Sequence, residues 1–153
     1  MNYSNIKTLQ INLNRSAVAT ESALDLAIGL EVGIIAVQEP WVFPSLNNDY
    51  TTTRSVVHQG YTQILPNHGS LRPRTLFYIS KALSFISIAH DSPQDPDCLI
   101  IDINKGNSKI QLINIYNEKD LNGAGIYTID RGLIPSPLYQ YSIILGDFNT
   151  HHP

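Results

Sequence analysis

Apolar positions in the first third of the chain predict a strand, a helix and a second strand. Apolar and polar residues alternate over residues 8–14, as in a strand with one buried face. Ser16 is the predicted N-cap of a helix that runs to about Val32, and Gly33 is its predicted stop. The continuous apolar run over residues 34–37 is typical of a strand covered on both faces. This order predicts two parallel strands joined by a right-handed helical crossover.

The predicted helix carries apolar residues at helical spacing, which we expect to form its buried stripe. They are Ala19, Ala23, Leu26, Ala27 and Leu30. Such a stripe would pack the helix against the sheet that the two strands begin.

Beyond residue 40, turn-forming residues separate short β-branched or aromatic runs. Residues 41–72 have weak periodicity, which predicts a long irregular segment with a short strand near 61–65. The strands predicted next span residues 75–79, 83–88, 99–104 and 109–116. The turn residues at 105–108 predict that the last two form a hairpin. We also expect a weak helix at 125–131 and a final strand at 141–145.

Length and composition favour one compact domain spanning residues 1–153. The chain has 153 residues, of which 42% are hydrophobic and 15% charged, so it can form a real core. Its net charge of -3 gives no global positive field toward nucleic acid or anionic membranes, so any nucleic-acid contact must be local.

The single cysteine, Cys98, excludes an internal disulfide and a cysteine-based zinc site, and its apolar neighbours predict a core position. No apolar stretch approaches the length of a membrane-spanning helix, and the N-terminus lacks the pattern of a secretory signal. We therefore expect an intracellular protein with no membrane partner.

Polar residues follow the apolar segments at four predicted strand ends. They are Asn12, Glu39, Tyr116, and the pair Asp147 and Asn149. Binding sites in open α/β sheets form beyond the carboxyl ends of the strands, so these residues predict one polar pocket.

The carboxylates and amides in this set have both a functional and a structural interpretation. Asp147 and Asn149, two apart on an extended segment, would share a face and suit a hard cation or a phosphate oxygen, with Phe148 as an inward anchor. The same residues are also ordinary Asx-turn formers. Glu39 could hold Mg²⁺, or it could be a solvated residue before Pro40.

The remaining candidates also leave two interpretations open. Asn12 either bonds its own turn or binds phosphate, and Tyr116 is either a half-buried aromatic or a hydrogen-bond donor to phosphate. His151 and His152 point to opposite faces of an extended chain, which argues against a shared metal. The basic cluster at residues 72–74 is interpreted as a solvated loop in preference to a phosphate contact.

Four motifs, taken in order, resemble those of the endonuclease/exonuclease/phosphatase superfamily. They are LQINLNRS at residues 9–16, IIAVQEPW at 34–41, INIYN at 113–117 and GDFN at 146–149. More narrowly, the QEPW motif, and the GDFN motif with the two histidines and proline near it, resemble the apurinic/apyrimidinic-type endonuclease domain of non-LTR (LINE-type) retrotransposons.

The resemblance implies a DNase I-like fold, a four-layer α/β/β/α sandwich, and DNA nicking by metal-dependent phosphodiester hydrolysis. It makes Glu39 the carboxylate ligand of Mg²⁺ or Mn²⁺, with Asn12 helping to set the metal and the phosphate. It makes Asp147 the residue that aligns or deprotonates the attacking water. Asn149 would hold the scissile phosphate, and Tyr116 would donate a hydrogen bond to it. Neutral donors and a divalent cation would stabilise the developing charge with few basic residues.

The chain departs from the family pattern in two places. Proline does not follow Tyr116, and the late Ser-Asp-His-type segment of the family has no counterpart by Pro153. We therefore expect the N-terminal portion of the domain, truncated at the C-terminus and catalytically impaired. The full-length relatives would carry a reverse transcriptase domain and act in the nucleus, although no basic targeting run is present.

Two other functions remain open at this point. One is a superfamily phosphatase or exonuclease that acts on another phosphoester, and the other is a non-catalytic remnant that binds nucleic acid or protein. Hydrolysis of a small phosphoester without action on plasmid DNA would favour the first, and the absence of metal-dependent activity would favour the second.

Overall fold

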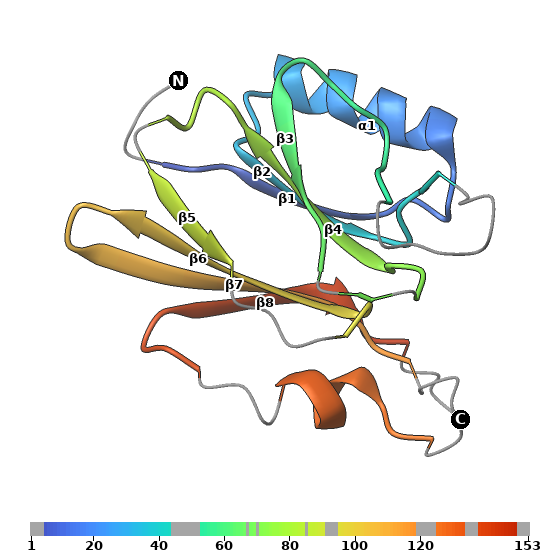
Figure 1. Cartoon of the computed structure of the whole chain (residues 1–153). Coiled ribbons are helices and arrows are strands. Elements are labelled where there is room, and N and C mark those ends of the chain that lie inside the picture. The colour runs from blue at the N-terminus through green and yellow to red at the C-terminus, as the bar shows by residue number, and fades with distance from the viewer. Residues whose placement is uncertain are drawn as a thin grey trace.

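Two four-stranded sheets pack face to face between helical segments (Figure 1). The computed structural model describes residues 5–43, 53–66, 68–69, 71–84, 86–90, 95–118, 125–133 and 138–149. Helix α1 (Ala17–Gly29) covers the outer face of one sheet, and the short π-type helix η1 (Ile129–Leu133) lies beneath the other. The predicted α/β/β/α layering is confirmed, with only a short helix in the last layer.

The first sheet contains the predicted parallel crossover. Its strands are β1 (Thr8–Asn12), β2 (Ile34–Gln38), β3 (Tyr61–Ile64) and β4 (Thr75–Ser80), in the order β1-β2-β4-β3. Strands β1 and β2 are parallel, and the other two pairs are antiparallel. All five residues of β2 are buried, as its apolar run predicted.

The second sheet contains the predicted hairpin. Its strands are β5 (Ser87–His90), β6 (Cys98–Lys105), β7 (Ser108–Tyr116) and β8 (Ser142–Asp147), in the order β5-β6-β7-β8. The β6–β7 hairpin turns at Gly106, whose φ of 58° lies in the left-handed region that glycine tolerates best. Strands β7 and β8 are parallel.

Helix α1 begins where the sequence predicts and ends earlier. The Ser16 hydroxyl accepts a hydrogen bond from the Ala19 backbone N–H at 3.1 Å, which confirms the N-cap. The helix ends at Gly29 instead of about Val32 because Glu31 adopts a left-handed φ of 55°. The turn that stops the helix therefore precedes the predicted stop at Gly33.

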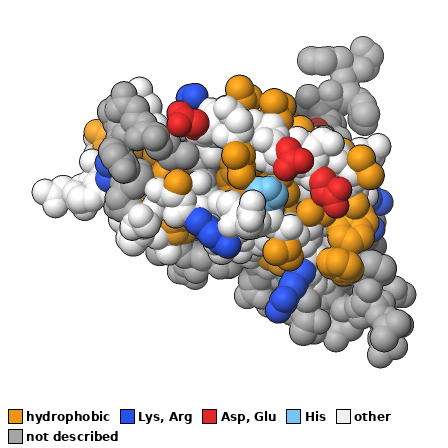
Figure 2. All heavy atoms as spheres, turned by 90° about the horizontal axis from the view of Figure 1, so that it is seen from above, with side chains coloured by type: hydrophobic (Ala, Val, Ile, Leu, Met, Phe, Trp, Pro, Cys, Tyr) orange, Lys and Arg blue, Asp and Glu red, His pale blue; other side chains and the backbone are white. Residues whose placement is uncertain are grey.

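The predicted stripe of α1 was wrong in part. Leu26 and Leu30 are more than half exposed, whereas Thr20 and Leu24 are buried with the predicted Ala23 and Ala27. Positions 20, 23, 24 and 27 follow the i, i+3, i+4, i+7 spacing of one helix face, and this face packs on the sheet. Figure 2 looks onto the outer side of this layer, where apolar side chains are interspersed with acidic ones.

Three other element boundaries differ from the sequence expectation. Strand β1 ends at Asn12 and not at Asn14, because Asn14 has a left-handed φ of 45°. The strand predicted at 83–88 is confined to Ser87–His90, since Leu83 is buried in the preceding turn. The weak helix predicted at 125–131 corresponds to η1, which starts later.

Apolar side chains form separate cores between the layers. Between the sheets lie Ile34, Ala36, Phe77, Ile79, Leu83, Leu99, Ile101, Ile103 and Leu112. Beneath α1, Leu24, Ala27, Ile35, Val37, Leu76 and Tyr78 are among the buried residues. On the η1 side, Leu133 packs against a cluster that includes Cys98, which confirms the predicted core position of the cysteine.

No helix in the described part of the chain is long and apolar enough to cross a membrane.

We predict that Gly146→Ala destabilises the fold, because an added Cβ would lie 2.3 Å from the Ile115 carbonyl oxygen on the paired strand. The strands would have to separate, and overpacking of this kind costs about 1–3 kcal/mol. Gly29→Ala is the matched control, since nothing lies within 4 Å of its Cβ position and alanine favours a helix. Urea unfolding measures both, and equal stabilities would contradict the prediction.

We predict that stability falls at alkaline pH through the buried thiol. Burial, followed by the negative charge of Asp95, raises the pKa of Cys98 from its ordinary 9.0 to about 12. Between these values the unfolded chain releases a proton that the folded chain keeps, so stability declines by up to about 1.4 kcal/mol per pH unit. Urea unfolding between about pH 8 and about pH 11 measures the decline. A Cys98→Ala variant should decline less, and an identical slope would exclude the thiol as its source.

Candidate active site

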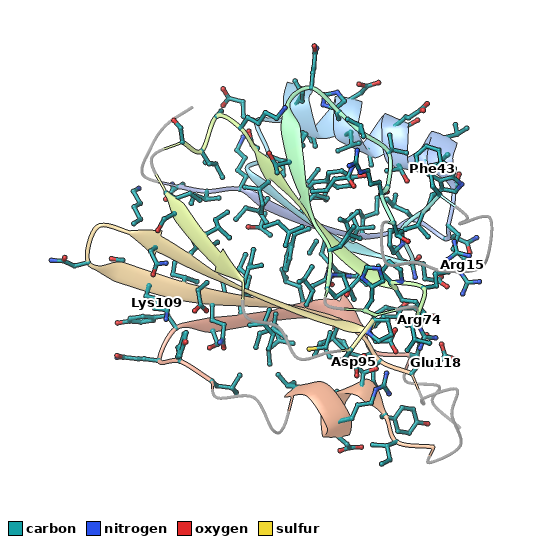
Figure 3. All side chains as sticks on the ribbon, in the orientation of Figure 1. Arg15, Phe43, Arg74, Asp95, Lys109 and Glu118 are labelled. Atoms are coloured by element: carbon teal, nitrogen blue, oxygen red, sulfur yellow. The ribbon has the colours of Figure 1, made fainter. Side chains whose placement is uncertain are left out.

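The four predicted strand ends meet at one edge of the paired sheets. The β1–β2 register pairs Asn12 with Gln38, and the β7–β8 register pairs Tyr116 with Asp147. Because each pair is parallel, all four strands end on the same side, and the two sheets place these ends against each other. Figure 3 shows Arg15, Arg74, Asp95 and Glu118 at this end of the molecule and Lys109 at the other.

Asn12 and Asp147 join the two sheets at this edge. The Asn12 Nδ2 donates a hydrogen bond to Asp147 Oδ2 at 2.9 Å, although the residues are 135 positions apart. The other carboxylate oxygen of Asp147 accepts from the Asn149 backbone N–H at 3.1 Å. Asn12 Oδ1 accepts from the Asn14 backbone N–H at 2.8 Å, so the amide is held in one orientation. The carboxylate is therefore fixed by neutral donors.

Glu39 follows β2 and turns its carboxylate toward the second sheet. Its Oε1 accepts a hydrogen bond from the Tyr116 hydroxyl at 3.3 Å and lies 3.1 Å from Arg15 Nη2. The Glu39 side chain is only 14% exposed, whereas that of Arg15 is 49% exposed. Backbone bonds to Arg74 O and from Arg15 N hold the residue on both sides. Glu39 is thus a largely buried carboxylate that faces a hydroxyl and a guanidinium.

Tyr116 is held between anionic and neutral groups. Burial raises the pKa of its hydroxyl, and the negative charges of Glu39 and Glu118 raise it further. A hydrogen bond with the Asn149 side chain and the positive charge of Arg74 act in the opposite direction. The net pKa is raised, so the hydroxyl keeps its proton at neutral pH and is a hydrogen-bond donor.

Left-handed backbone conformations gather at this edge. Asn14, Arg15, Glu39 and Asn149 have φ values between 44° and 57°, and among the described residues other than glycine only Glu31 shares such a φ. These conformations cost free energy and persist where surrounding contacts fix them, often at functional sites. Two of these four positions, Glu39 and Asn149, are predicted site residues, and the other two follow Asn12.

The structure brings all five predicted site residues to this edge. Asn12 contacts Asp147, Tyr116 contacts Glu39, and Asn149 bonds back to the β7 end through Nδ2 to Asn117 O at 3.2 Å. The Asx-turn interpretation of residues 147–149 is also present, in the bond from Asn149 N–H to Asp147.

The structure contradicts two further predictions about the segment after β8, and a third prediction falls outside the residues that it describes. Phe148 was predicted to turn inward, but it is 37% exposed. Asn149 itself is not extended, so it does not share a strand face with Asp147. His151 and His152 lie outside the described residues.

An ion network beside Tyr116 was missed by the sequence analysis. Arg74 donates two 2.5 Å hydrogen bonds to Asp97 and one of 2.9 Å to Glu118. Arg131 also donates to Asp97, and to Asp95 at 2.6 Å. Asp97 is fully buried; burial raises the pKa of its carboxyl, and the hydrogen bonds and charge of Arg74 oppose this.

This network corrects the interpretation of residues 72–74 as a solvated loop. The Arg74 side chain is 12% exposed, and its guanidinium lies over the Tyr116 ring at 5.0 Å from the centroid. The only sequence signal was a pair of acids, Asp95 and Asp97, directly before an apolar strand. Because the partners are 23 and 34 residues from Asp97, local patterning could not pair them.

The donor set at the edge suits a hard divalent cation. Within the described ranges, no group of three or more His, Cys, Asp or Glu side chains could hold a metal ion. Mg²⁺ usually binds one or two carboxylates and completes its shell with water and substrate phosphate. Glu39, with oxygen donors from Asn12 and Asp147 near the same edge, fits this preference.

We predict that Asp97→Asn destabilises the fold by about 3 kcal/mol, because two largely buried guanidiniums would lose the charge of the buried carboxylate that they share. Asp25→Asn is the control, since Asp25 pairs with His58 at 3.6 Å and its side chain is 79% exposed. That variant should change stability by less than about 0.5 kcal/mol. Urea unfolding compares the two, and a small effect at Asp97 would show that the network is dispensable.

No protein-family model and no curated protein sequence matches the chain. Solved structures do match. The endonuclease domain of TRAS1, a telomere-specific non-LTR retrotransposon, aligns with a TM-score of 0.66 and 16% identity, over 97% of this chain and 61% of that domain. The zebrafish (D. rerio) TDP2 complexed with a single-strand DNA product aligns with a TM-score of 0.56 and 15% identity, over 97% of this chain and 62% of that one.

A third similar structure is the AP endonuclease LMAP from Leishmania major, with a TM-score of 0.53 and 16% identity. It covers 73% of this chain and 40% of the other. The chain thus spans less than two thirds of the length of each of these proteins. At these identities the likeness establishes the fold alone: the chain has the DNase I-like fold that its four motifs predicted.

Proposed function

We propose that this chain belongs to a metal-dependent, DNA-nicking endonuclease of the non-LTR retrotransposon type, a hydrolase of phosphodiester bonds. The observation that carries the proposal is the pairing, at one sheet edge, of Asn12 with Asp147 and of Tyr116 with Glu39. A carboxylate held by neutral donors, a second carboxylate and a protonated hydroxyl can act as general base, cation ligand and hydrogen-bond donor in the hydrolysis of a phosphodiester.

Asp147 is the proposed residue that aligns or deprotonates the attacking water. Its two carboxylate oxygens offer about four acceptor sites, of which Asn12 and the Asn149 N–H use two. A water molecule can therefore donate to the remaining sites. The Asn12 amide sets the direction in which the carboxylate faces.

Tyr116 and Asn149 are the proposed donors to the scissile phosphate. Both are neutral, so they bind the phosphate oxygens without a basic cluster, in keeping with the net charge of -3. Because burial and nearby carboxylates raise the pKa of Tyr116, its hydroxyl keeps its proton over the neutral range. That one proton is donated to Glu39 here, and a phosphate oxygen would accept it in place of Glu39. Donors fixed before the reaction stabilise the charge that develops on the phosphate.

Glu39 and Asn12 are the proposed ligands of Mg²⁺ or Mn²⁺. Such a cation, when bound, supplies Lewis-acid stabilisation of charge on the phosphate oxygens. Glu39 is positioned for it by the bonds of its backbone to Arg74 and Arg15, and Arg15 balances the carboxylate charge beside it.

The proposed partners follow from this activity. The TRAS1 domain is an endonuclease of a retrotransposon, and the TDP2 structure holds a DNA product. We extend this to DNA as the substrate here. In the full-length protein of a retrotransposon we also propose a reverse transcriptase domain and action in the nucleus.

We predict slow, Mg²⁺-dependent conversion of supercoiled plasmid to open circles when the chain is in excess over the plasmid. EDTA should stop it, and Asp147→Asn should slow it by about 100-fold or more, as expected on loss of a general base. Glu39→Gln should weaken the binding of Mn²⁺, measured by calorimetry, whereas Glu21→Gln on the exposed face of α1 should not.

Each outcome separates the proposal from its alternatives. Nicking that persists in Asp147→Asn or in EDTA would overturn the assigned site. Hydrolysis of a small phosphoester without plasmid nicking would favour a phosphatase. Binding of DNA without any nicking, at any protein excess, would favour a non-catalytic binding module.

A further inference from the structure

Two aromatic side chains, Trp41 and Phe43, lie at the surface shortly after Glu39 in the sequence. In the segment 40–43, Pro40 and Val42 are buried, whereas Trp41 is partly exposed and Phe43 is 55% exposed. The Trp41 and Phe43 rings are in contact, with centroids 4.6 Å apart and planes at 65°. The Phe43 N–H donates to Arg54 O at 3.0 Å. Buried neighbours and a backbone bond therefore hold the aromatic pair in place at the surface.

The aromatic pair lies close to the proposed metal ligand. An extended chain spans about 3.5 Å per residue, so Trp41 is within about 7 Å of Glu39 along the backbone and Phe43 within about 14 Å. Figure 3 shows Phe43 and Arg15 at the same end of the molecule. Since successive nucleotides of a duplex strand are about 3.4 Å apart, the larger of these upper limits corresponds to at most about four nucleotides.

Charge favours nucleobases as the ligand of this pair. The net charge of -3 gives weak general attraction to phosphates, and Arg74 and Arg131 are neutralised inside the network. Arg15, half exposed, is the positive group that bonds to Glu39. Stacking of a base on an aromatic ring contributes about 1–3 kcal/mol and needs no net charge. In an edge-to-face pair, one ring keeps a face that a base can cover.

We propose that Trp41 and Phe43 form a base-stacking platform that binds an unstacked nucleobase of the DNA strand, within about four nucleotides of the scissile phosphate. The proposal rests on the proposed nuclease function for its location and adds to it a substrate preference. Bases inside a duplex already stack on their neighbours, so the platform favours single-stranded or distorted DNA over regular duplex.

The single tryptophan of the chain makes the platform directly observable. The test titrates the full chain, with EDTA present to prevent cleavage, and records Trp41 fluorescence and the anisotropy of a labelled oligonucleotide. The probes are a single-stranded DNA, an abasic strand of equal length and the matching duplex. We expect the base-bearing single strand to quench Trp41 and the abasic strand to bind roughly five- to hundredfold more weakly without quenching.

Substitutions at Phe43 distinguish stacking from apolar contact. Phe43→Ala and Phe43→Leu should weaken single-strand binding, whereas Phe43→Tyr should restore it because the ring is kept. Tyr141→Ala is the matched control, since Tyr141 is 62% exposed but precedes β8, at the end opposite to Asp147. Thermal unfolding checks that each variant is folded.

The platform would be overturned if the abasic strand bound and quenched Trp41 as well as the base-bearing strand does. It would also be overturned if binding left Trp41 fluorescence unchanged, or if the chain bound none of the three probes. The proposed function fails separately, in the nicking assay. Quenching is measured in EDTA, where no cleavage occurs, and nicking is measured with Mg²⁺, so loss of one result does not imply loss of the other.

Discussion

A hydrogen bond between two buried amide side chains joins the two sheets, and the arrangement of the candidate site depends on it. Gln38 on β2 donates to Asn114 Oδ1 on β7 at 2.5 Å, and both side chains are fully buried. Asn114 Nδ2 donates to the carbonyls of Val37 and Leu76 at 2.9 and 3.0 Å. Because an unsatisfied buried amide is costly, the sheets can pack only in the register that makes these bonds.

The two amides that form this bridge lie close in sequence to two residues of the proposed site. Gln38 directly precedes Glu39, and Asn114 lies two residues before Tyr116 on the same face of β7. A change in the relative position of the sheets would therefore separate the Tyr116 hydroxyl from the Glu39 carboxylate. The parallel strands bring the polar residues at their ends to one side of each sheet. The buried amides then determine how closely the strand ends of one sheet approach those of the other.

The sequence could predict what is encoded locally. The Ser16 cap, the buried run of β2 and the β6–β7 hairpin each depend on residues a few positions apart, and they were predicted correctly. The four motifs placed the site at the strand ends, although the roles of its residues stay predictions. The Asn114 bridge and the Arg74 ion pair join residues 76 and 23 positions apart across sheets, which no local pattern specifies. The predicted buried stripe of α1 was wrong in part because more than one face of the helix carries apolar residues. The sequence pattern alone did not show which of these faces packs on the sheet.

The charges near the site explain how an acidic chain can suit a polyanionic substrate. Arg74 lies over the Tyr116 ring and Arg131 bonds to Asp97, yet both guanidiniums are engaged by carboxylate or carbonyl oxygens. Their charge stabilises the ion network at this edge and is largely neutralised there, so it attracts distant phosphates only weakly. Affinity for the proposed DNA substrate would then arise at short range, from the proposed neutral donors, the proposed divalent cation and the exposed rings of Trp41 and Phe43. Such contacts depend on geometry more than on net charge, so under this proposal the same arrangement would select for the conformation of the DNA.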